Sequence, residues 1–320
     1  MEKQITTYIH HFTADQPIWL LLLSSLGFLI ILKKFISFLK WVFNNFLRTP
    51  KDLKTYGSWA LITGSTDGIG KAFAYQLAQK GLNLILVSRN SHKLKTVSTE
   101  IQAMFPDTKI KKIKLDFSGN VTSGLRLIEE AVRDVDLGVL INNVGITYPA
   151  AMFFHEVDEK VWMDIVRVNL EGTSNVTRAV LPGMIERKRG AVVNIGSGAS
   201  IVVPSHPLYA IYAATKAYVD QLSRCLYVEY KQFGIDVQCQ VPLYVATKMA
   251  SRVAATEESS FFIPSACDYG RAAVRQIGFE PRCSPYWTHS IQWFFAGFLP
   301  EPLLNAWRFS IGIRRRENSS

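Results

Sequence analysis

Residues 56–90 read YGSWALITGSTDGIGKAFAYQLAQKGLNLILVSRN. A β-rich run at 59–63 leads into Gly64, Gly68 and Gly70, and an amphipathic stretch then separates these glycines from a second β-rich run at 83–88. Glycines at this position let the backbone approach a pyrophosphate, and the start of the following helix supplies N–H donors. The glycines lie between a strand and a helix, so a dinucleotide site is favoured over a simple turn.

The end of the second β-rich run indicates which dinucleotide binds. An NAD-binding protein commonly places an acidic residue there, but this chain has Ser88 and Arg89. A guanidinium can hold a 2′-phosphate through two hydrogen bonds, and Lys71 adds a second cation. We therefore expect NADP(H), with a solvated arginine as the alternative interpretation of Arg89. The predicted contacts from the glycine loop are Gly64, Ser65, Thr66, Gly68, Ile69 and Gly70.

Short β-rich runs alternate with amphipathic stretches from residue 58 onward, which is typical of βαβ units. Right-handed crossovers would join them into a doubly wound parallel sheet with ligands at the carboxyl ends of its strands. The predicted class is α/β, a Rossmann-type doubly wound parallel sheet with an N-terminal transmembrane anchor. The strands are expected at 59–63, 83–88, 109–115, 138–143, 191–196 and 236–241.

The anchor is predicted from the uncharged run PIWLLLLSSLGFLIIL at 17–32. A membrane span needs about 20 apolar residues, so Trp19 and the snorkelling Lys33 and Lys34 would extend it. A cleaved signal peptide is the alternative, but no small-x-small cleavage site precedes the lysines. Basic residues follow the run, so the bulk of the chain is expected on the cytosolic side.

Composition agrees with a membrane neighbour. Of the 320 residues 48% are hydrophobic and 19% charged, and the formal charge of +10 is spread along the chain. This spread favours an anionic membrane surface over nucleic acid, which we do not expect as a partner. Four widely spaced cysteines suggest no metal site and a reducing compartment, although two disulfides are the alternative.

A second apolar run, IQWFFAGFL at 291–299, is too short to span a membrane. A re-entrant element, an interfacial element and ordinary core are equally compatible with it. The sequence thus divides into an anchor with a basic juxtamembrane segment at 1–54, a dinucleotide-binding domain at 55–290 and an apolar, basic tail at 291–320.

The spacing Tyr-x-x-x-Lys occurs three times, at Tyr212, Tyr227 and Tyr244. Only the first copy follows closely on a strand end, NIGSGAS at 194–200, and falls near the start of the next helix. A phenol can donate the proton that carbonyl reduction requires. Moving its pKa from about 10 to 7 takes about 4 kcal/mol of preferential stabilisation of the phenolate, which Lys216 and an oxidised nicotinamide would supply. Ser197 would hold the substrate oxygen, or simply form a local turn.

The ordered set TGSTDGIG, NNVG at 142–145, Asn169, Ser197 and YAATK at 212–216 resembles the short-chain dehydrogenase/reductase family over about 55–290. The resemblance implies that Tyr212 is the acid/base and that Lys216 binds the nicotinamide ribose and tunes Tyr212. It further implies that Ser197 orients the carbonyl. By the same resemblance Asn169 would support a water relay, although it could instead simply bend its helix. Asp116 would contact the adenine ring, and Asn142 would border the cofactor.

Within that family the chain is most similar to membrane-bound 3-oxoacyl-CoA reductases of very-long-chain fatty acid elongation, particularly the plant form. The likeness is carried by the anchor, residues 56–90, FHEVDE at 154–159 and VQCQVPLYVATKM at 237–249. It implies NADPH-dependent reduction of 3-oxoacyl-CoA at the endoplasmic reticulum membrane, facing the cytosol, beside other elongase components. Val245 and Thr247 would contact the nicotinamide end.

Two rival functions stay open at this point. A 17β-hydroxysteroid or other lipid-carbonyl reductase would use the same catalytic groups, because substrate choice lies in 244–300, where spacing says little. A catalytically silent scaffold of the elongation complex would keep the fold, although it has no chemical need for an intact catalytic set.

Overall fold

The computed structural model describes residues 17–119, 121–254 and 258–317. Its contacts divide the chain into two units, Met1–Thr49 and Pro50–Ser320, which are described separately. The division falls a few residues before the expected boundary at 54. Leu53 is 3% exposed, and the Lys51 Nζ lies 2.9 Å from an Asp236 carboxylate oxygen, so these residues belong to the second unit.

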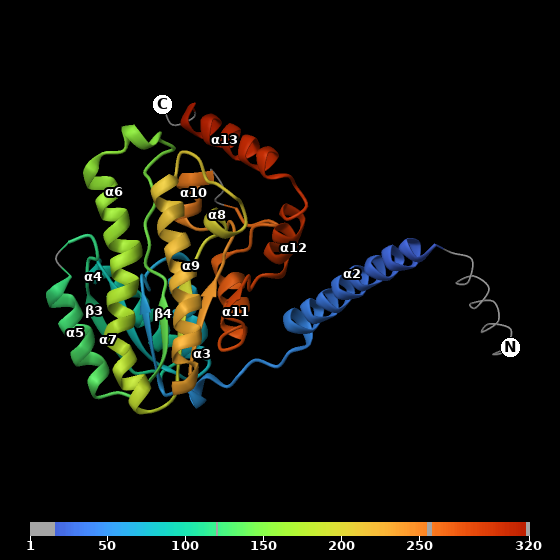
Figure 1. Ribbon diagram of the computed structural model, residues 1–320. Coiled ribbons are helices and arrows are strands. Elements are labelled where there is room, and N and C mark those ends of the chain that lie inside the picture. Colours follow the sequence, from blue (N-terminus) through green and yellow to red (C-terminus); the bar gives the residue numbers. More distant parts are fainter. Residues whose placement is uncertain (1–16, 120, 255–257, 318–320) are drawn as a thin grey trace, which may run out of the picture. The chain divides into compact units, whose positions relative to one another are not determined.

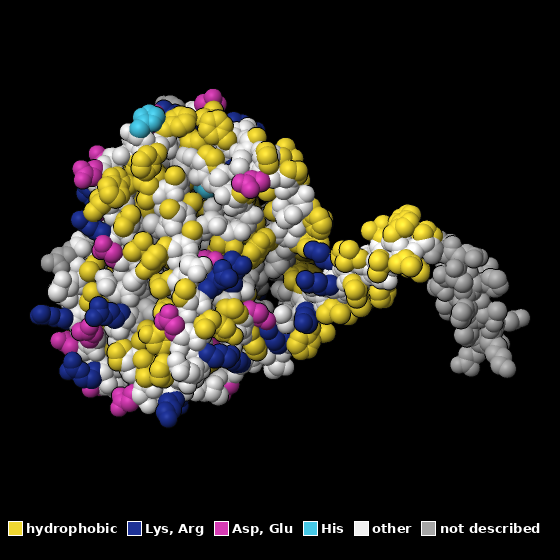
Figure 2. Space-filling model, viewed as in Figure 1, with side chains coloured by type: hydrophobic (Ala, Val, Ile, Leu, Met, Phe, Trp, Pro, Cys, Tyr) yellow, Lys and Arg dark blue, Asp and Glu magenta, His cyan; other side chains and the backbone are white. Residues whose placement is uncertain are grey.

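In the first unit α2 (Ile18–Val42) continues directly into the π-helical turn η1 (Phe43–Leu47). The predicted apolar run and the amphipathic stretch after it are therefore one helix, with Lys33 and Lys34 inside it rather than at its end. At 1.5 Å per residue the 25 residues of α2 span about 37 Å, more than a bilayer core requires. The mean hydropathy is 2.0, and none of the most apolar window is buried. Figure 2 shows hydrophobic side chains along most of α2, with basic side chains gathered near one end.

The second unit is built on one seven-stranded parallel sheet in the order β3-β2-β1-β4-β5-β6-β7 (Figure 1). At its centre Ile62 of β1 lies opposite Leu86 of β2 on one side and Ile141 of β4 on the other. Strand order reverses at this point, which opens a crevice for ligands at the carboxyl ends. The strands are β1 (Trp59–Thr63), β2 (Asn83–Ser88), β3 (Ile110–Lys114), β4 (Leu137–Asn142), β5 (Gly190–Ile195), β6 (Ile235–Gln240) and β7 (Arg282–Cys283).

The six predicted strands are confirmed; β1 and β2 have the predicted bounds, and the ends of the other four shift by one residue. The seventh, β7, has two residues and is too short to leave an alternating pattern in the sequence. It is a strand because Cys239 and Gln240 of β6 pair with it. Alternate residues of each strand point to opposite faces of the sheet, so β1, β2, β4 and β5 each contribute to two hydrophobic cores.

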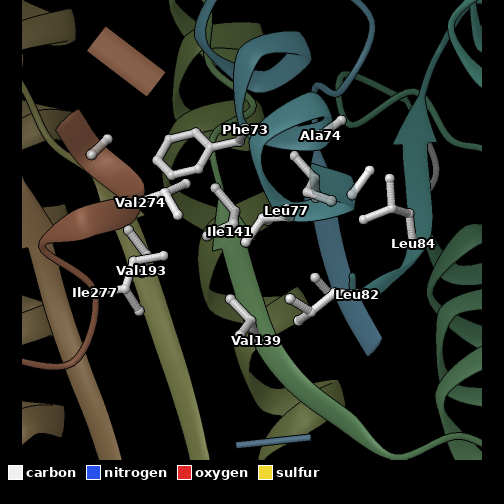
Figure 3. Packing of buried hydrophobic residues seen from close by; sticks show 14 of the residues in the cluster. Phe73, Ala74, Leu77, Leu82, Leu84, Val139, Ile141, Val193, Val274 and Ile277 are labelled. Atoms are coloured by element: carbon white, nitrogen blue, oxygen red, sulfur yellow. The ribbon is translucent and has the colours of Figure 1, made fainter. Parts of the chain in front are cut away.

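The first core lies under α3 (Gly68–Gln79), α4 (Ser91–Met104) and α11 (Ala266–Arg275). In Figure 3 Phe73 and Leu77 of α3 and Val274 of α11 pack over Ile141 and Val193 of the sheet. The second core, on the opposite face, lies under α5 (Thr122–Arg133), α7 (Gly172–Glu186) and α9 (Ala210–Tyr230). Helices on both faces complete the doubly wound architecture.

Shorter helices occupy the end of the sheet where the strands finish: α6 (Glu159–Val166), η4 (Arg167–Glu171), α8 (Gly198–Ile201) and α10 (Lys248–Ala254). Among the 3₁₀ turns, η2 (Leu53–Thr55) precedes β1, η3 (Phe154–Glu156) precedes α6, and η5 (Lys231–Phe233) follows α9. The chain closes with α12 (Trp287–Ala296) and α13 (Glu301–Glu317). Figure 1 shows α13 across the same end of the unit as α8 and α10.

The apolar run at 291–299 contains no fully buried residue, and its first three residues are half-buried. Thr288 and His289 in the first turn of α12 are fully buried, whereas Phe294, Phe295 and Phe298 are 53%, 63% and 63% exposed. The buried turn of α12 therefore precedes the run, whose exposed phenyl rings disfavour ordinary core and leave the re-entrant and interfacial interpretations open. In α13 Leu304, Arg308 and Gly312 are buried at intervals of four residues, so one face of this helix packs on the unit.

Candidate active site

The glycine loop between β1 and α3 has a backbone that only glycine fits. Gly64 and Gly68 have φ values of +64° and +49°, in the left-handed region. A Cβ on Gly70 would lie 2.3 Å from the Gly64 carbonyl oxygen and 2.3 Å from the Asn143 Nδ2. The loop is thus compact, and it leads into the N-terminus of α3, an arrangement that suits a pyrophosphate.

Asn143 holds this loop in place. Its Nδ2 donates to the carbonyl oxygens of Thr63 and Gly64 at 3.0 and 3.2 Å. Thr63 Oγ1 in turn accepts from the backbone N–H groups of Asn143 and Val144 at 3.0 and 3.1 Å. Sequence reasoning did not single out Asn143, although it lies in the NNVG motif at the end of β4, beside the loop.

Asn142, which the sequence predicts at the border of the cofactor, is 3% exposed and faces the side of the sheet opposite to Asn143. Its Nδ2 donates to Thr177 Oγ1 and Asn194 Oδ1, each at 2.8 Å. A border with the cofactor stays a prediction for Asn142, but its amide hydrogens are used inside the fold. The alternation of side chains along β4 is the signal that separates these two neighbours.

Ser65, Thr66 and Ser88 join β1 and β2 at their carboxyl ends. Ser65 is fully buried, and its hydroxyl donates to the Val87 carbonyl oxygen at 3.3 Å. Thr66 Oγ1 and Ser88 Oγ are 2.8 Å apart. Ile69, in the first turn of α3, packs against the first core. Ser65 and Ile69 therefore shape the loop chiefly through burial.

Arg89 is exposed immediately after β2. Asp116 lies near it, and the pKa of this carboxyl is lowered by hydrogen bonds from Ser118 and by the Arg89 charge. Lys71, expected as a second cation, is paired with Glu100 at 2.8 Å. Its charge is thus already neutralised, and Arg89 is the stronger candidate for a 2′-phosphate.

The predicted catalytic residues Ser197, Tyr212 and Lys216 lie together at the carboxyl end of β5. Ser197 caps α8, and its Oγ accepts from the Ala199 N–H at 3.2 Å and hydrogen-bonds with the Tyr212 hydroxyl. Tyr212 and Lys216 lie in the first two turns of α9, which begins at Ala210. The Lys216 Nζ is 6.0 Å from the centroid of the Tyr212 ring.

Burial is the largest influence on the pKa values of Tyr212 and Lys216. It raises the pKa of Tyr212, which the hydrogen bond from Ser197 partly offsets. Burial also lowers the pKa of the Lys216 ammonium to about 8, and the Nζ donates to the Ile195 carbonyl oxygen at 2.8 Å. At neutral pH Tyr212 is therefore a protonated phenol, which is the form that can donate to a ketone. The tuning of Tyr212 by Lys216 stays a prediction.

Asn169 lies in η4, a π-helical turn, so the helix does widen at this residue. Its amide exchanges two hydrogen bonds with the Ile146 backbone, at 2.8 and 2.9 Å, and also donates to Thr215 Oγ1 at 3.1 Å. A Cβ on Gly145 would lie 3.3 Å from Asn169 Oδ1 and 3.4 Å from the Lys216 Nζ. Asn169 thus reaches the neighbourhood of Lys216, and its part in a water relay stays a prediction.

The other two Tyr-x-x-x-Lys copies are placed elsewhere. The Lys231 Nζ lies 3.4 Å from the Tyr227 hydroxyl near the exposed end of α9. Tyr244 does not face its own lysine, because its hydroxyl accepts from Arg315 at 3.0 Å while Lys248 lies 3.5 Å from Asp67. Only the first copy meets a strand-end serine.

Val245 and Thr247 follow β6. Val245 is 3% exposed and belongs to the first core. The Thr247 methyl group would lie 3.0 Å from a Cβ on Gly68, so Thr247 packs directly against the glycine loop. Contact with a nicotinamide stays a prediction for both residues, and Thr247 is the better placed.

Comparisons with known proteins agree with this geometry. Residues 58–258 match the family model described as short chain dehydrogenase. A very-long-chain 3-oxoacyl-CoA reductase-like protein of Arabidopsis thaliana is 60% identical over 306 residues, 95% of this chain and 97% of that protein. The human inactive hydroxysteroid dehydrogenase-like protein 1 is 43% identical over 265 residues, 82% of this chain and 78% of that protein.

Among solved structures, a short-chain dehydrogenase from Sphingobium yanoikuyae in complex with NADPH is similar, with a TM-score of 0.60 and 27% identity. The match covers 68% of this chain and 82% of that chain. The segment matched by the family model contains the whole predicted catalytic set, from Asn169 to Lys216.

Proposed function

The chain belongs to the short-chain dehydrogenase family, and we propose that it reduces 3-oxoacyl-CoA to 3-hydroxyacyl-CoA with NADPH in very-long-chain fatty acid elongation. The observation that carries the chemistry is the hydrogen-bonded pair Ser197–Tyr212 with Lys216 beside it at the end of β5. The substrate class is supported by the plant relative, which is similar over nearly its whole length.

In this proposal the bound cofactor supplies the hydride, and the protein manages the oxygen. Tyr212 donates its phenolic proton to the carbonyl oxygen, and Ser197 hydrogen-bonds with that oxygen as charge develops on it. A positioned proton donor contributes about 10²–10⁴-fold to the rate, and each oxyanion donor about 10²–10³-fold. Lys216 uses one of its three N–H donors on Ile195, which leaves two for the hydroxyls of a nicotinamide ribose.

The residues fit NADPH on two counts. The glycine loop closes tightly before α3, because a Cβ on Gly70 would meet the Gly64 carbonyl oxygen at 2.3 Å, and a helix N-terminus after such a loop suits a pyrophosphate. Arg89 offers an exposed guanidinium at the end of β2, where a carboxylate would repel a 2′-phosphate. The solved relative that contains NADPH supports the same choice.

We further propose that α2 anchors the enzyme in the endoplasmic reticulum membrane with the second unit in the cytosol. The length and hydropathy of the helix and the basic residues after it support this placement. Other elongase components would then be neighbours in the same membrane. Protease protection of N- and C-terminal tags in sealed microsomes tests the orientation, since a protected C-terminal tag would contradict it.

A direct substrate comparison tests the proposed reaction. Purified full-length protein in detergent would be assayed with a long 3-oxoacyl-CoA and with a steroid ketone, each with NADPH. We expect turnover of the acyl-CoA. Turnover of the steroid alone would reject the proposed substrate in favour of a hydroxysteroid dehydrogenase.

A silent scaffold is the second candidate, because a relative with 43% identity is named as inactive. NADPH binding without turnover of either substrate would favour it. The juxtaposition of Ser197, Tyr212 and Lys216 in this chain supports an active enzyme instead.

A further inference from the structure

Beside the candidate active site, α13 directs two arginines toward polar side chains of the fold. Arg308 and Arg315 meet Tyr244 in the loop after β6 and His206 and Tyr209 in the segment before α9. These five residues are called the arginine cluster. Arg308 is 8% exposed, and among the described residues no carboxylate oxygen lies within 4.0 Å of it.

The neighbours of Arg308 do not neutralise it. Its Nη2 lies 2.6 and 3.0 Å from the two ring nitrogens of His206, and it also hydrogen-bonds with Tyr244. Burial, Arg308 and Arg315 together lower the pKa of His206 to about 3, so the imidazole is neutral. The buried Nε of Arg308 has no hydrogen-bond partner. A buried cation without an anion is costly to keep, which indicates a site that an anionic ligand completes.

The electrostatics of Tyr244 point the same way. Although burial raises its pKa, the charges of Arg308 and Arg315 outweigh that effect and lower the pKa below the ordinary value. The Arg315 guanidinium lies 5.5 Å from the centre of the Tyr244 ring and donates to its hydroxyl at 3.0 Å. The cluster therefore favours negative charge at this position.

The cluster is close to the catalytic group. Tyr244 is near enough to influence the pKa of Tyr212, and Tyr209 immediately precedes α9, which carries Tyr212. The loop after β6 and the carboxyl end of the sheet are where α/β folds of this kind receive their ligands. An anion held here would belong to a molecule that reaches Tyr212.

We propose that Arg308 and Arg315 bind a phosphate group of the coenzyme A portion of the substrate. This inference rests on the proposed function, since a steroid ketone carries no phosphate. Two planar guanidiniums suit phosphate oxygens, which accept paired hydrogen bonds. α13 would thereby select for acyl-CoA over neutral ketones.

The test compares substrates with and without phosphate. Full-length Arg308→Gln in detergent would be assayed with a 3-oxoacyl-CoA and with the 3-oxoacyl N-acetylcysteamine thioester, which lacks the phosphates. We expect KM for the CoA thioester to rise about 10- to 100-fold, with KM for the short thioester and Kd for NADPH unchanged. Arg314→Gln removes an exposed charge from the same helix and should change none of these values. Arg308→Lys, which keeps the charge, should recover most of the affinity.

Equal KM values for the CoA thioester in Arg308→Gln and Arg314→Gln would overturn the proposal. If Arg308→Gln no longer binds NADPH, Arg315→Gln, at a half-buried position, decides the question by the same measure. Should the wild-type protein reduce no 3-oxoacyl-CoA, thermal stabilisation by coenzyme A still tests the site. Loss of that stabilisation in Arg308→Gln would retain the site and reject only the proposed reaction, whereas equal stabilisation would reject the site. Equal stabilisation of the wild-type protein by inorganic phosphate alone would overturn the assignment to the substrate.

Discussion

Replacing Tyr212 by phenylalanine removes one oxygen and leaves the ring over Lys216. The lost hydroxyl is the proposed proton donor, so reduction should slow by about 10²–10⁴-fold, equivalent to about 2.7–5.4 kcal/mol in the activation barrier. The fold should tolerate the change. One hydrogen bond to Ser197 is lost, worth about 1 kcal/mol, and the cost of burying the hydroxyl is removed with it. Kd for NADPH should stay within about twofold, because ribose binding is assigned to Lys216.

The assay follows NADPH absorbance in single turnovers at saturating 3-oxoacyl-CoA, with cofactor affinity measured by quenching of tryptophan fluorescence. Tyr227→Phe is the matched control, since Tyr227 has the same interval to its lysine but lies near the exposed end of α9. It should keep the wild-type rate. Full turnover by Tyr212→Phe, or a comparable loss in Tyr227→Phe, would refute the assignment of the proton donor.

Four further outcomes are expected. Arg89→Leu should weaken NADPH binding about 10- to 100-fold while NADH binding is unchanged, measured by fluorescence titration; an equal loss for both cofactors would contradict the role of the 2′-phosphate. The pKa of Lys216 is lowered to about 8, so its ammonium is present below that pH and lost above it. The reduction rate should therefore fall as pH rises through about 8, and Lys216→Arg should remove this fall from the pH–rate profile. Gly70→Ala should abolish NADPH binding because its Cβ would meet the Gly64 carbonyl oxygen at 2.3 Å, whereas Gly119→Ala, with nothing within 4 Å, should bind normally. Deletion of residues 1–49, which form a separate contact unit, should make the protein extractable from membranes by carbonate with turnover preserved; retention after carbonate would show that another segment integrates.

Local pattern was enough for the main elements of the fold. The strands β1, β2, β4, β5 and β6 are buried β-rich runs, and each glycine of the loop stands at a strand-to-helix junction, so both were predictable from periodicity and spacing. The same holds for the choice of Tyr212 among three copies, because its distance along the chain from the end of β5 placed it beside Ser197.

Features that depend on distant partners were not predictable. β7 is defined only by its pairing with β6, and Asn143 rather than Asn142 reaches the glycine loop because β4 turns that side chain toward Gly64. Lys71 proved to be paired with Glu100 on the neighbouring helix α4. Each of these contacts joins residues far apart in the sequence, and spacing carries no information about them.

The sequence by itself determined the parallel sheet, the glycine loop, the meeting of Ser197, Tyr212 and Lys216 and the apolar N-terminal helix, because each rests on neighbours within a few turns or one strand of the chain. Only the tertiary structure decided how the C-terminal segment is used. It brings Arg308 to within hydrogen-bonding distance of His206, about one hundred residues earlier, and so encloses a positive charge beside the active site. Burial and charge compensation are properties of the packed chain, and no local pattern around Arg308 encodes them.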